Sequence, residues 1–316
     1  MTRSRPRRGV FWAATLVSVV LAAVGGVLIW SGLQNSSGPD AVVASYFDAL
    51  RRADAPAALS YGDIPSGPHE LLTSTVLAEQ QRIAPIRHVG VVSVERHGDH
   101  ATVNVRYELA YPDGLLQQMA AVPVHRAGGT WRLDAVATST TLSLPQAADR
   151  ARLLGARVPT TRTALFPGAV PIRFDTAYLA LDPQRSSVRL ASQPTLAVGV
   201  EVTAAAERAI AGELTKSVQA CLARPSAGSA CPLPDSRAVP GTVTGELTGA
   251  VAREATYRVS GDPVGRIVVG GRVGFTGSYS ALDFSNLPAK RTGEFSLPLT
   301  CSVYAVAPVR ILWSRG

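Results

Sequence analysis

The stretch Val10–Leu33, VFWAATLVSVVLAAVGGVLIWSGL, contains 24 residues and no charged side chain. At 1.5 Å of rise per residue, about 20 apolar residues cross a hydrocarbon core of ~30 Å. The tail before it, residues 1–9, holds four arginines and no acid. Because cationic residues resist translocation, this tail is expected to stay in the cytoplasm. The sequence therefore predicts one transmembrane helix at residues 10–33, an integral protein of the cell membrane and a long extracytoplasmic remainder.

A cleaved signal peptide is the alternative for this stretch. Signal peptides have an apolar core of roughly 7 to 15 residues that ends in small residues. Here the core is longer and ends in Leu28-Ile29-Trp30, which favours an uncleaved anchor. Ala22-Ala23 and Gly25-Gly26 supply small residues inside the core, so the alternative stays open.

The charge balance argues against a nucleic-acid partner. The formal net charge is +8, from 31 basic and 23 acidic residues. Without the four arginines of the tail, 27 basic and 23 acidic residues remain, and they form no basic run. Such a mild excess is typical of a solvated surface. We therefore expect the membrane and other envelope proteins as partners, and leave the oligomeric state open.

The three cysteines predict one disulfide. Cys221 and Cys231 are separated by the nine residues LARPSAGSA, and outside the cytoplasm such a pair is expected to be oxidised. A metal pair is the alternative, but the spacing does not suit zinc and no histidine follows His125. Cys301 lies in an apolar run and is expected to be a buried free thiol. No cofactor and no metal site are predicted.

The first outer segment is predicted to contain three helices and then four antiparallel strands. Pro39-Asp40 suits the first turn of a helix, and residues 54–63 and 71–83 continue with helical spacing. After Pro85 the period changes to two, and the turns at residues 97–100, 112–114 and 127–129 separate strands.

Two parts of this segment carry a family resemblance. YFDALRRADAPAALSY (Tyr46–Tyr61) resembles the first two helices of the nuclear transport factor 2-like superfamily, including its small membrane-anchored actinobacterial members. GGTWRLDAVA (Gly128–Ala137) is similar to that superfamily's last hairpin and strand. The resemblance covers residues 39–144 and implies a cone of helices on an antiparallel sheet. This fold hosts isomerases, dehydratases, adaptors without a pocket and parts of secretion systems, so it implies no single activity.

A second α+β domain is expected at residues 161–316, after a linker at residues 145–160 that includes a helix at Gln146–Ala156. Its pattern of strands, one long helix (Thr203–Ala223) and further antiparallel strands differs from that of the first domain. Thr203 is suited to cap the long helix. The helix and the following Cys-x9-Cys loop resemble the distal domain of actinobacterial membrane-anchored proteins of unknown function.

Candidate site residues follow from the resemblance to cone-fold enzymes, which often line the cone with an Asp/His or Asp/Tyr pair. Possible ligand-binding residues here are Tyr46, Tyr61, His88 and His125, with Asp134 as a possible partner. No spacing fixes a pair, so no catalytic residue is assigned. His97, Asp99 and His100 could hold a metal, but their place in a hairpin turn favours solvated side chains.

Familiar catalytic motifs are absent from the sequence. Similar domains precede the transpeptidase domain of some penicillin-binding proteins, but Ser-x-x-Lys and Lys-Thr-Gly do not occur, and Lys290-Arg291-Thr292-Gly293 contains an inserted Arg. Gly-x-Ser-x-Gly, HExxH and the phosphate-binding Gly-Lys-Ser/Thr loop are also missing. We therefore expect a non-catalytic binding or assembly module of the bacterial cell envelope, one version being an accessory of a secretion or conjugation channel. A small-molecule-binding or enzymatic cone is the alternative.

Overall fold

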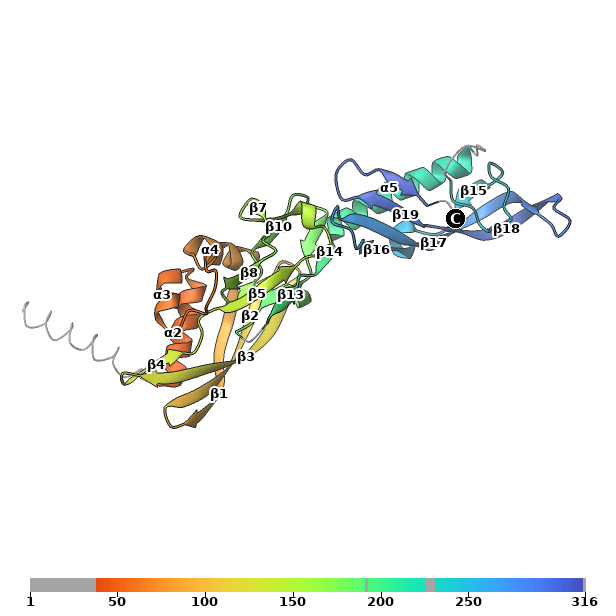
Figure 1. Cartoon of the computed structure of the whole chain (residues 1–316). Helices are drawn as coiled ribbons and strands as arrows, with labels where there is room; N and C mark the ends of the chain where they lie inside the picture. Colours follow the sequence, from red (N-terminus) through yellow and green to blue (C-terminus); the bar gives the residue numbers. More distant parts are fainter. Residues whose placement is uncertain (1–37, 191–192, 225–230, 315–316) are drawn as a thin grey trace, which may run out of the picture.

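The computed structural model describes residues 38–190, 193–224 and 231–314 and shows an elongated α+β molecule with two lobes (Figure 1). The predicted tail 1–9 and membrane segment 10–33 lie outside the described residues. Among the residues that are described, no helix combines the length and apolar character needed to cross a membrane.

Three helices open the first lobe, as the sequence predicts: α2 (Pro39–Arg51), α3 (Ala55–Ser60) and α4 (Ser74–Ile83). Side chains at the N-caps set where α3 and α4 begin. The Asp54 carboxylate accepts a hydrogen bond from the Ala57 N–H at 3.1 Å, and the Thr73 hydroxyl accepts one from the Val76 N–H at 3.2 Å. Each cap satisfies an N–H group that has no partner within the helix.

Four antiparallel strands follow in the order β1-β2-β3-β4: β1 (Ile86–His97), β2 (His100–Tyr111), β3 (Gly114–Ala127) and β4 (Thr130–Leu133). Along β2 buried and more exposed side chains alternate, because successive side chains point to opposite faces of a sheet. The helices cover one face of this sheet (Figure 1), and the apolar side chains of both layers form one core. The predicted order of three helices and four strands is confirmed.

The next part of the chain, residues 138–202, differs from the expected linker and domain start. Its elements are β5 (Thr138–Ser143), the 3-10 turn η1 (Ala148–Arg150), β6 (Ala151–Leu153), β7 (Ala156–Arg157), β8 (Arg162–Leu165), β9 (Gly168–Ala169), β10 (Ile172–Phe174), β11 (Leu179–Leu181), the 3-10 turn η2 (Pro183–Arg185), β12 (Ser187–Val188), β13 (Thr195–Ala197) and β14 (Val200–Val202). They form small sheets, including β13-β5-β8, in which β13 runs parallel to β5.

The helix expected at Gln146–Ala156 is not formed. Ala151 and Leu153 instead point into a core from β6, and the chain turns back at Leu154 and Gly155, whose φ angles are 49° and 85°. Residues 164–190 divide between two cores: some join the core of the preceding helices and sheet, and others form a separate small core with residues 142–153 and 196–198. For the description that follows we call residues 38–202 the first lobe and 203–314 the second.

The second lobe begins with the predicted long helix, α5 (Ala204–Ala223), and the Thr203 hydroxyl caps it by accepting from the Ala206 N–H at 3.2 Å. The remaining elements are β15 (Thr244–Leu247), α6 (Val251–Glu254), β16 (Ala255–Val259), β17 (Arg266–Leu282), β18 (Pro288–Pro298), β19 (Cys301–Tyr304) and β20 (Ile311–Trp313). The 17-residue strand β17 pairs with four neighbours, β15, β16, β18 and β19. All of these pairs are antiparallel, as predicted.

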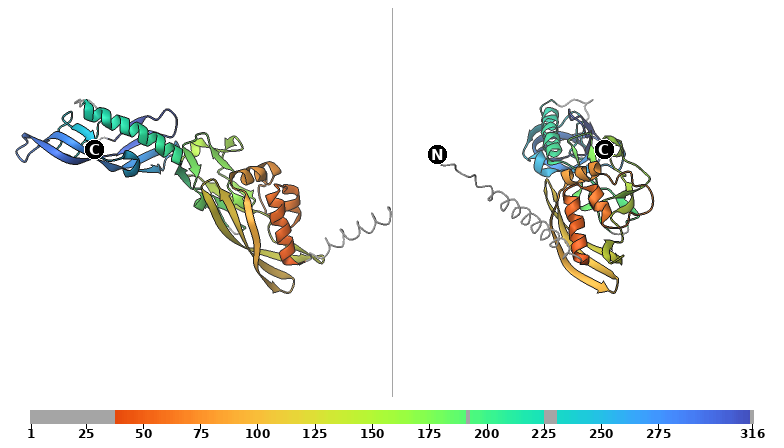
Figure 2. Two further views of the ribbon diagram at one scale, coloured as in Figure 1. Left: turned by 180° about the vertical axis from the view of Figure 1, so that it is seen from behind. Right: turned by 90° about the vertical axis from the view of Figure 1, so that its left-hand side faces the viewer.

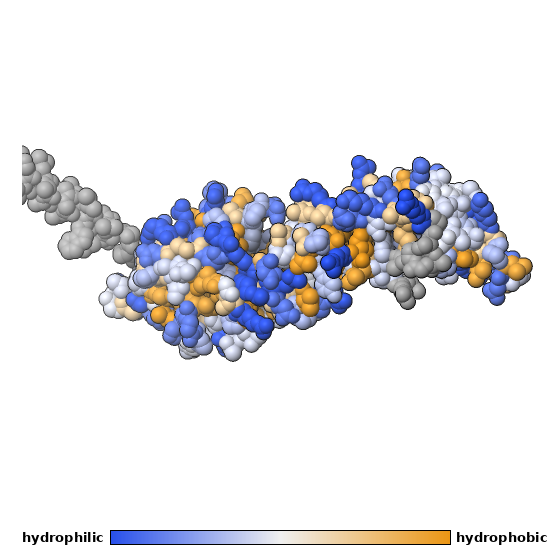
Figure 3. Space-filling view, turned by 90° about the horizontal axis from the view of Figure 1, so that it is seen from above, coloured by the Kyte–Doolittle hydropathy of each residue, from blue (hydrophilic) through white to orange (hydrophobic). Residues whose placement is uncertain are grey.

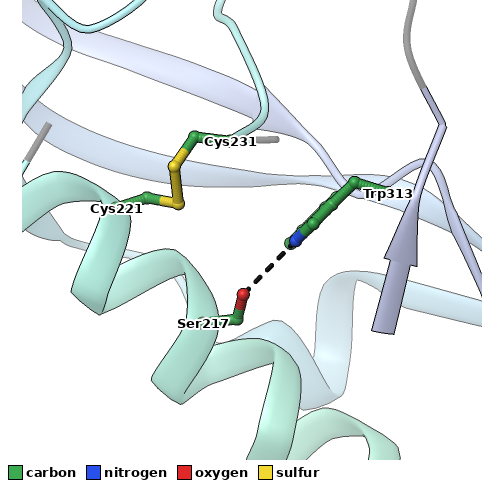
Figure 4. The surroundings of a disulfide bond; sticks show 4 residues. All are labelled: Ser217, Cys221, Cys231 and Trp313. Atoms are coloured by element: carbon green, nitrogen blue, oxygen red, sulfur yellow. Dashed lines mark hydrogen bonds between the residues drawn. A yellow bond between two sulfur atoms is a disulfide. The ribbon is translucent and has the colours of Figure 1, made fainter. Parts of the chain in front are cut away.

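The predicted disulfide joins Cys221, near the end of α5, to Cys231 (Figure 4). One turn earlier on the helix, Ser217 accepts a hydrogen bond at 3.3 Å from the indole N–H of Trp313 in β20. These two links hold the end of α5 to the chain that follows it. Cys301 is buried with a free thiol, as predicted, and burial raises its pKa to about 12.

The two lobes lie end to end (Figure 2), and residues 146–150 contact the loop between β16 and β17. The Ala147 N–H donates to the Asp262 carbonyl at 3.0 Å, and the Arg150 Nε donates to the Val264 carbonyl at 3.0 Å. Gly265 has φ +71° and lies so close to Ala147 that an added Cβ would come within 2.6 Å of the Ala147 Cβ. The two lobes are therefore joined by close packing and hydrogen bonds as well as by the covalent chain.

Candidate functional site

The interior of the first lobe, between α2 and the sheet β1–β4, is the place where the family resemblance predicts a ligand-binding cone. Aromatic side chains fill it: Tyr46, Phe47 and Tyr107 all have an exposed fraction of 0%. The ring centroids of Tyr46 and Phe47 are 5.5 Å apart, and those of Phe47 and Tyr107 are 5.1 Å apart. Such distances are those of packed aromatic pairs, so the interior is a hydrophobic core.

A segment from later in the chain closes this interior. Ala164, Phe166, Ala169 and Leu190 belong to the same buried cluster as Tyr46 and Tyr107. We call residues 164–170 and 186–190 the covering segment.

Polar side chains of the helices and sheet bind the backbone of the covering segment. The amide nitrogen of Gln80, on α4, donates to the carbonyls of Phe166 and Ala169 at 3.0 and 2.9 Å. The Tyr111 hydroxyl, on β2, donates to the Ser186 carbonyl at 3.2 Å. These groups could face a ligand in an open cone, but here they satisfy buried carbonyls of the chain itself.

The phenols of the interior are poorly suited to proton transfer. The Tyr46 hydroxyl donates to the Val136 carbonyl at 2.6 Å, and burial raises its pKa well above the ordinary value. Burial also raises the pKa of Tyr107 to about 12, although nearby Arg189 lowers it slightly. A general base works best with a pKa near the working pH, so neither phenol fits that role. Within the described residues, the Tyr107 hydroxyl and the Thr140 hydroxyl are buried without a hydrogen-bond partner.

The four predicted ligand-binding residues do not meet at one site. Tyr46 is part of the core, and Tyr61 is half-buried at its edge. His88 is exposed, with 73% of its side chain accessible, and pairs with Glu108 at 2.6 Å. His125 pairs with Asp134 at 2.7 Å on the opposite, outer face of the sheet.

A row of histidines on that outer face was not predicted. The strand register pairs His97 with His100 and His100 with His125, so all three side chains share one face. The rings of His100 and His125 are 6.5 Å apart. The sequence places only His97 and His100 near each other. His125 lies 25 residues further along the chain and joins them only through the pairing of β3 with β2. In the part of the chain that the structure describes, no group of three or more His, Cys, Asp or Glu residues is arranged to hold a metal ion.

A surface pocket of about 260 Å³ lies beside the covering segment. Its walls are mainly apolar, and its polar members are Thr138, Ser139 and Arg162. The Arg162 Nε donates to the Ser139 hydroxyl at 2.9 Å. Among the described residues, the lining of this pocket contains no acid and no histidine.

No protein-family model and no curated protein matches the chain. Among solved structures, a SEC-C motif containing protein from Rhodopseudomonas palustris has 16% identity and a TM-score of 0.27, with 31% of this chain and 77% of that chain covered. A protein of unknown function from Mycobacterium tuberculosis has 17% identity and a TM-score of 0.24, with 30% and 64% covered. A putative NTF2-like transpeptidase from Campylobacter jejuni has 16% identity and a TM-score of 0.22, with 29% and 93% covered. Likenesses of this size assign no activity to the chain.

Proposed function

We propose that this chain is a single-pass, membrane-anchored extracytoplasmic protein that acts as a non-catalytic binding or assembly module of the bacterial cell envelope. In this proposal residues 10–33 are the anchor, residues 1–9 are the cytoplasmic tail, and the first lobe is a nuclear transport factor 2-like cone of the membrane-anchored actinobacterial type. An accessory of a secretion or conjugation channel is one version of this role.

The filled interior of the first lobe is the observation that supports a non-catalytic role. The residues in it are packed aromatics, and the covering segment accepts the hydrogen bonds that the Gln80 amide nitrogen and the Tyr111 hydroxyl donate. An enzyme of the cone type needs room for a substrate and two groups that can exchange protons. Because the interior of the first lobe is filled, we expect this chain to bind its partners through its outer surfaces.

Two further points agree with the proposed location and mode of action. The Cys221–Cys231 disulfide suits an oxidising compartment outside the cytoplasm. A module tethered to a membrane also meets other membrane proteins at a raised effective concentration, so even a weak contact can serve in assembly.

Crosslinking in living cells, followed by mass spectrometry, tests the proposal. A photoreactive residue is placed in the full chain at Met119 or Leu154, which are 56% and 47% exposed on different parts of the first lobe. We expect one or two membrane proteins to be captured reproducibly. The same residue at the buried position Phe47 is the matched control and should capture none of them.

Two results would contradict the proposal. Capture of nothing by a folded and membrane-inserted chain would argue against an assembly role and favour a cone that binds a small molecule. Fractionation of the intact chain as a soluble protein would argue against the anchor itself.

A further inference from the structure

The end of the β17–β18 hairpin carries an apolar tip at the extremity of the second lobe, far from α2 (Figures 1 and 2). Phe284 is 93% exposed, Leu287 is 63% exposed and Leu282 is 37% exposed. In the space-filling view, apolar residues gather at this end of the molecule (Figure 3). We call residues 282–288 the hairpin tip. Scattered exposed side chains are normal, but three within six residues at a protruding end form a patch.

The hairpin tip pairs most of its backbone N–H groups within the tip or with its immediate neighbours. The Asp283 N–H donates to the Leu287 carbonyl at 2.9 Å, and the Asn286 N–H donates to the Asp283 carbonyl at 3.1 Å. The Asp283 carboxylate accepts from the N–H groups of Ser285 and Leu287 at 2.8 and 2.9 Å. Asn286 adopts φ 59°, which Asn tolerates well in a turn. The turn is thus preorganised by these hydrogen bonds, and the carbonyls of residues 284–286 face outward, where water or lipid headgroups can bind them.

Two cations lie beside the apolar side chains. The Arg237 guanidinium stacks over the Phe284 ring, with its central carbon 4.6 Å from the ring centroid. Lys290 follows on β18 and is exposed. Within the described residues, neither Arg237 nor Lys290 takes part in an ion pair. Apolar side chains at a tip with cations beside them suit a bilayer surface, where acyl chains lie beneath charged headgroups and the long arginine and lysine side chains can reach those headgroups.

We propose that the hairpin tip inserts Phe284 and Leu287 into a lipid bilayer that carries anionic headgroups, with Arg237 and Lys290 at headgroup level. The two cations next to the apolar side chains favour a bilayer with anionic headgroups over an apolar protein groove, because such a groove would leave both charges without a counter-charge. This lipid contact adds to the proposed assembly role and does not depend on it.

Vesicle sedimentation tests the proposal on the full chain. The protein is held in phosphatidylcholine nanodiscs, and dense vesicles of phosphatidylcholine with or without phosphatidylglycerol are added. We expect the protein to sediment with the phosphatidylglycerol vesicles, and the double variant F284S/L287S to bind them about tenfold more weakly. The variant R237S/K290S should lose the preference for phosphatidylglycerol and the sensitivity of binding to salt.

L154S is the matched control, because it removes another exposed leucine from a turn of the first lobe. It should sediment like the unmodified chain. Equal sedimentation of F284S/L287S and the unmodified chain would overturn the proposal, as would absence of binding to both kinds of vesicle. Lipid-independent association of the chain with itself that F284S/L287S abolishes would also overturn it, by assigning the tip to a second copy.

Discussion

At the scale of single residues, Gln80 ties the covering segment to α4. Its side chain is fully buried and donates to two carbonyls of the covering segment, about 90 residues away in sequence. Gln80→Leu would leave both carbonyls buried without partners, at a cost of roughly 1–3 kcal/mol for each. We expect the free energy of unfolding to fall by about 2–6 kcal/mol in chemical denaturation. Gln219→Leu, on the exposed face of α5, is the matched control and should change it little.

Asp262 makes the joint between the lobes sensitive to acid. Burial alone would raise its pKa, but hydrogen bonds from Ser260, Arg266 and Gly265 lower the pKa to about 2. The unfolded chain takes up this proton first, near its ordinary pKa of about 3.9. The contribution of Asp262 to stability is therefore complete above about pH 4 and is lost as the pH falls toward 2.

Unfolding measured across this pH range checks the assignment. Ser260→Ala removes one donor, so its stability should depend less steeply on pH between about 4 and 2 than that of the unmodified chain. An unchanged slope would show that the Ser260 hydrogen bond does not lower the pKa of Asp262.

At the scale of elements, the disulfide stabilises the end of α5. Cys221 and Cys231 are ten positions apart, and closing so short a loop stabilises the fold by about 2–3 kcal/mol. Cys221→Ser together with Cys231→Ser should lower the free energy of unfolding by this amount, and the unmodified chain measured after reduction should show the same loss. In a thiol assay the native chain should show no reactive thiol, because Cys301 is buried, and the denatured, unreduced chain should show one. Three thiols in the denatured chain would mean that the disulfide is absent.

The elements that the sequence predicts well are those whose signals are local. The cap at Thr203, the helical spacing of α2 and the turn between β1 and β2 are all contained within a few residues. The sequence of region 145–202 contains few local signals for secondary structure, because its short strands are stabilised by partners that are distant in sequence. The Ala169 carbonyl accepts a hydrogen bond from the Gln80 amide nitrogen, and β5 pairs with β8 and β13. The closed interior could not be predicted for the same reason: a sequence shows that Tyr46 and Tyr107 are available, but not what covers them.

At the scale of the whole molecule, the contact between Gly265 and Ala147 holds the two lobes in one arrangement. Gly265→Ala adds a Cβ that would approach the Ala147 Cβ to 2.6 Å, at a φ of +71° that disfavours side chains. We expect the joint to open, and limited proteolysis to cut the chain near residues 146–150 faster than in the unmodified protein. Gly261→Ala is the matched control from the same loop, because an added Cβ there meets nothing within 4 Å. Equal cleavage of both variants would contradict the fitted joint.

The measurement that tests the account most directly is hydrogen exchange of the full chain, read on peptides that cover residues 164–170 and 186–190. A covering segment that belongs to the core should exchange as slowly as β2 and β3, since all of them are exposed only by unfolding of the first lobe. Fast exchange of the covering segment while β2 and β3 stay protected would show a lid that opens in the native state. That result would contradict the closed interior and would favour a first lobe that opens to bind a small molecule.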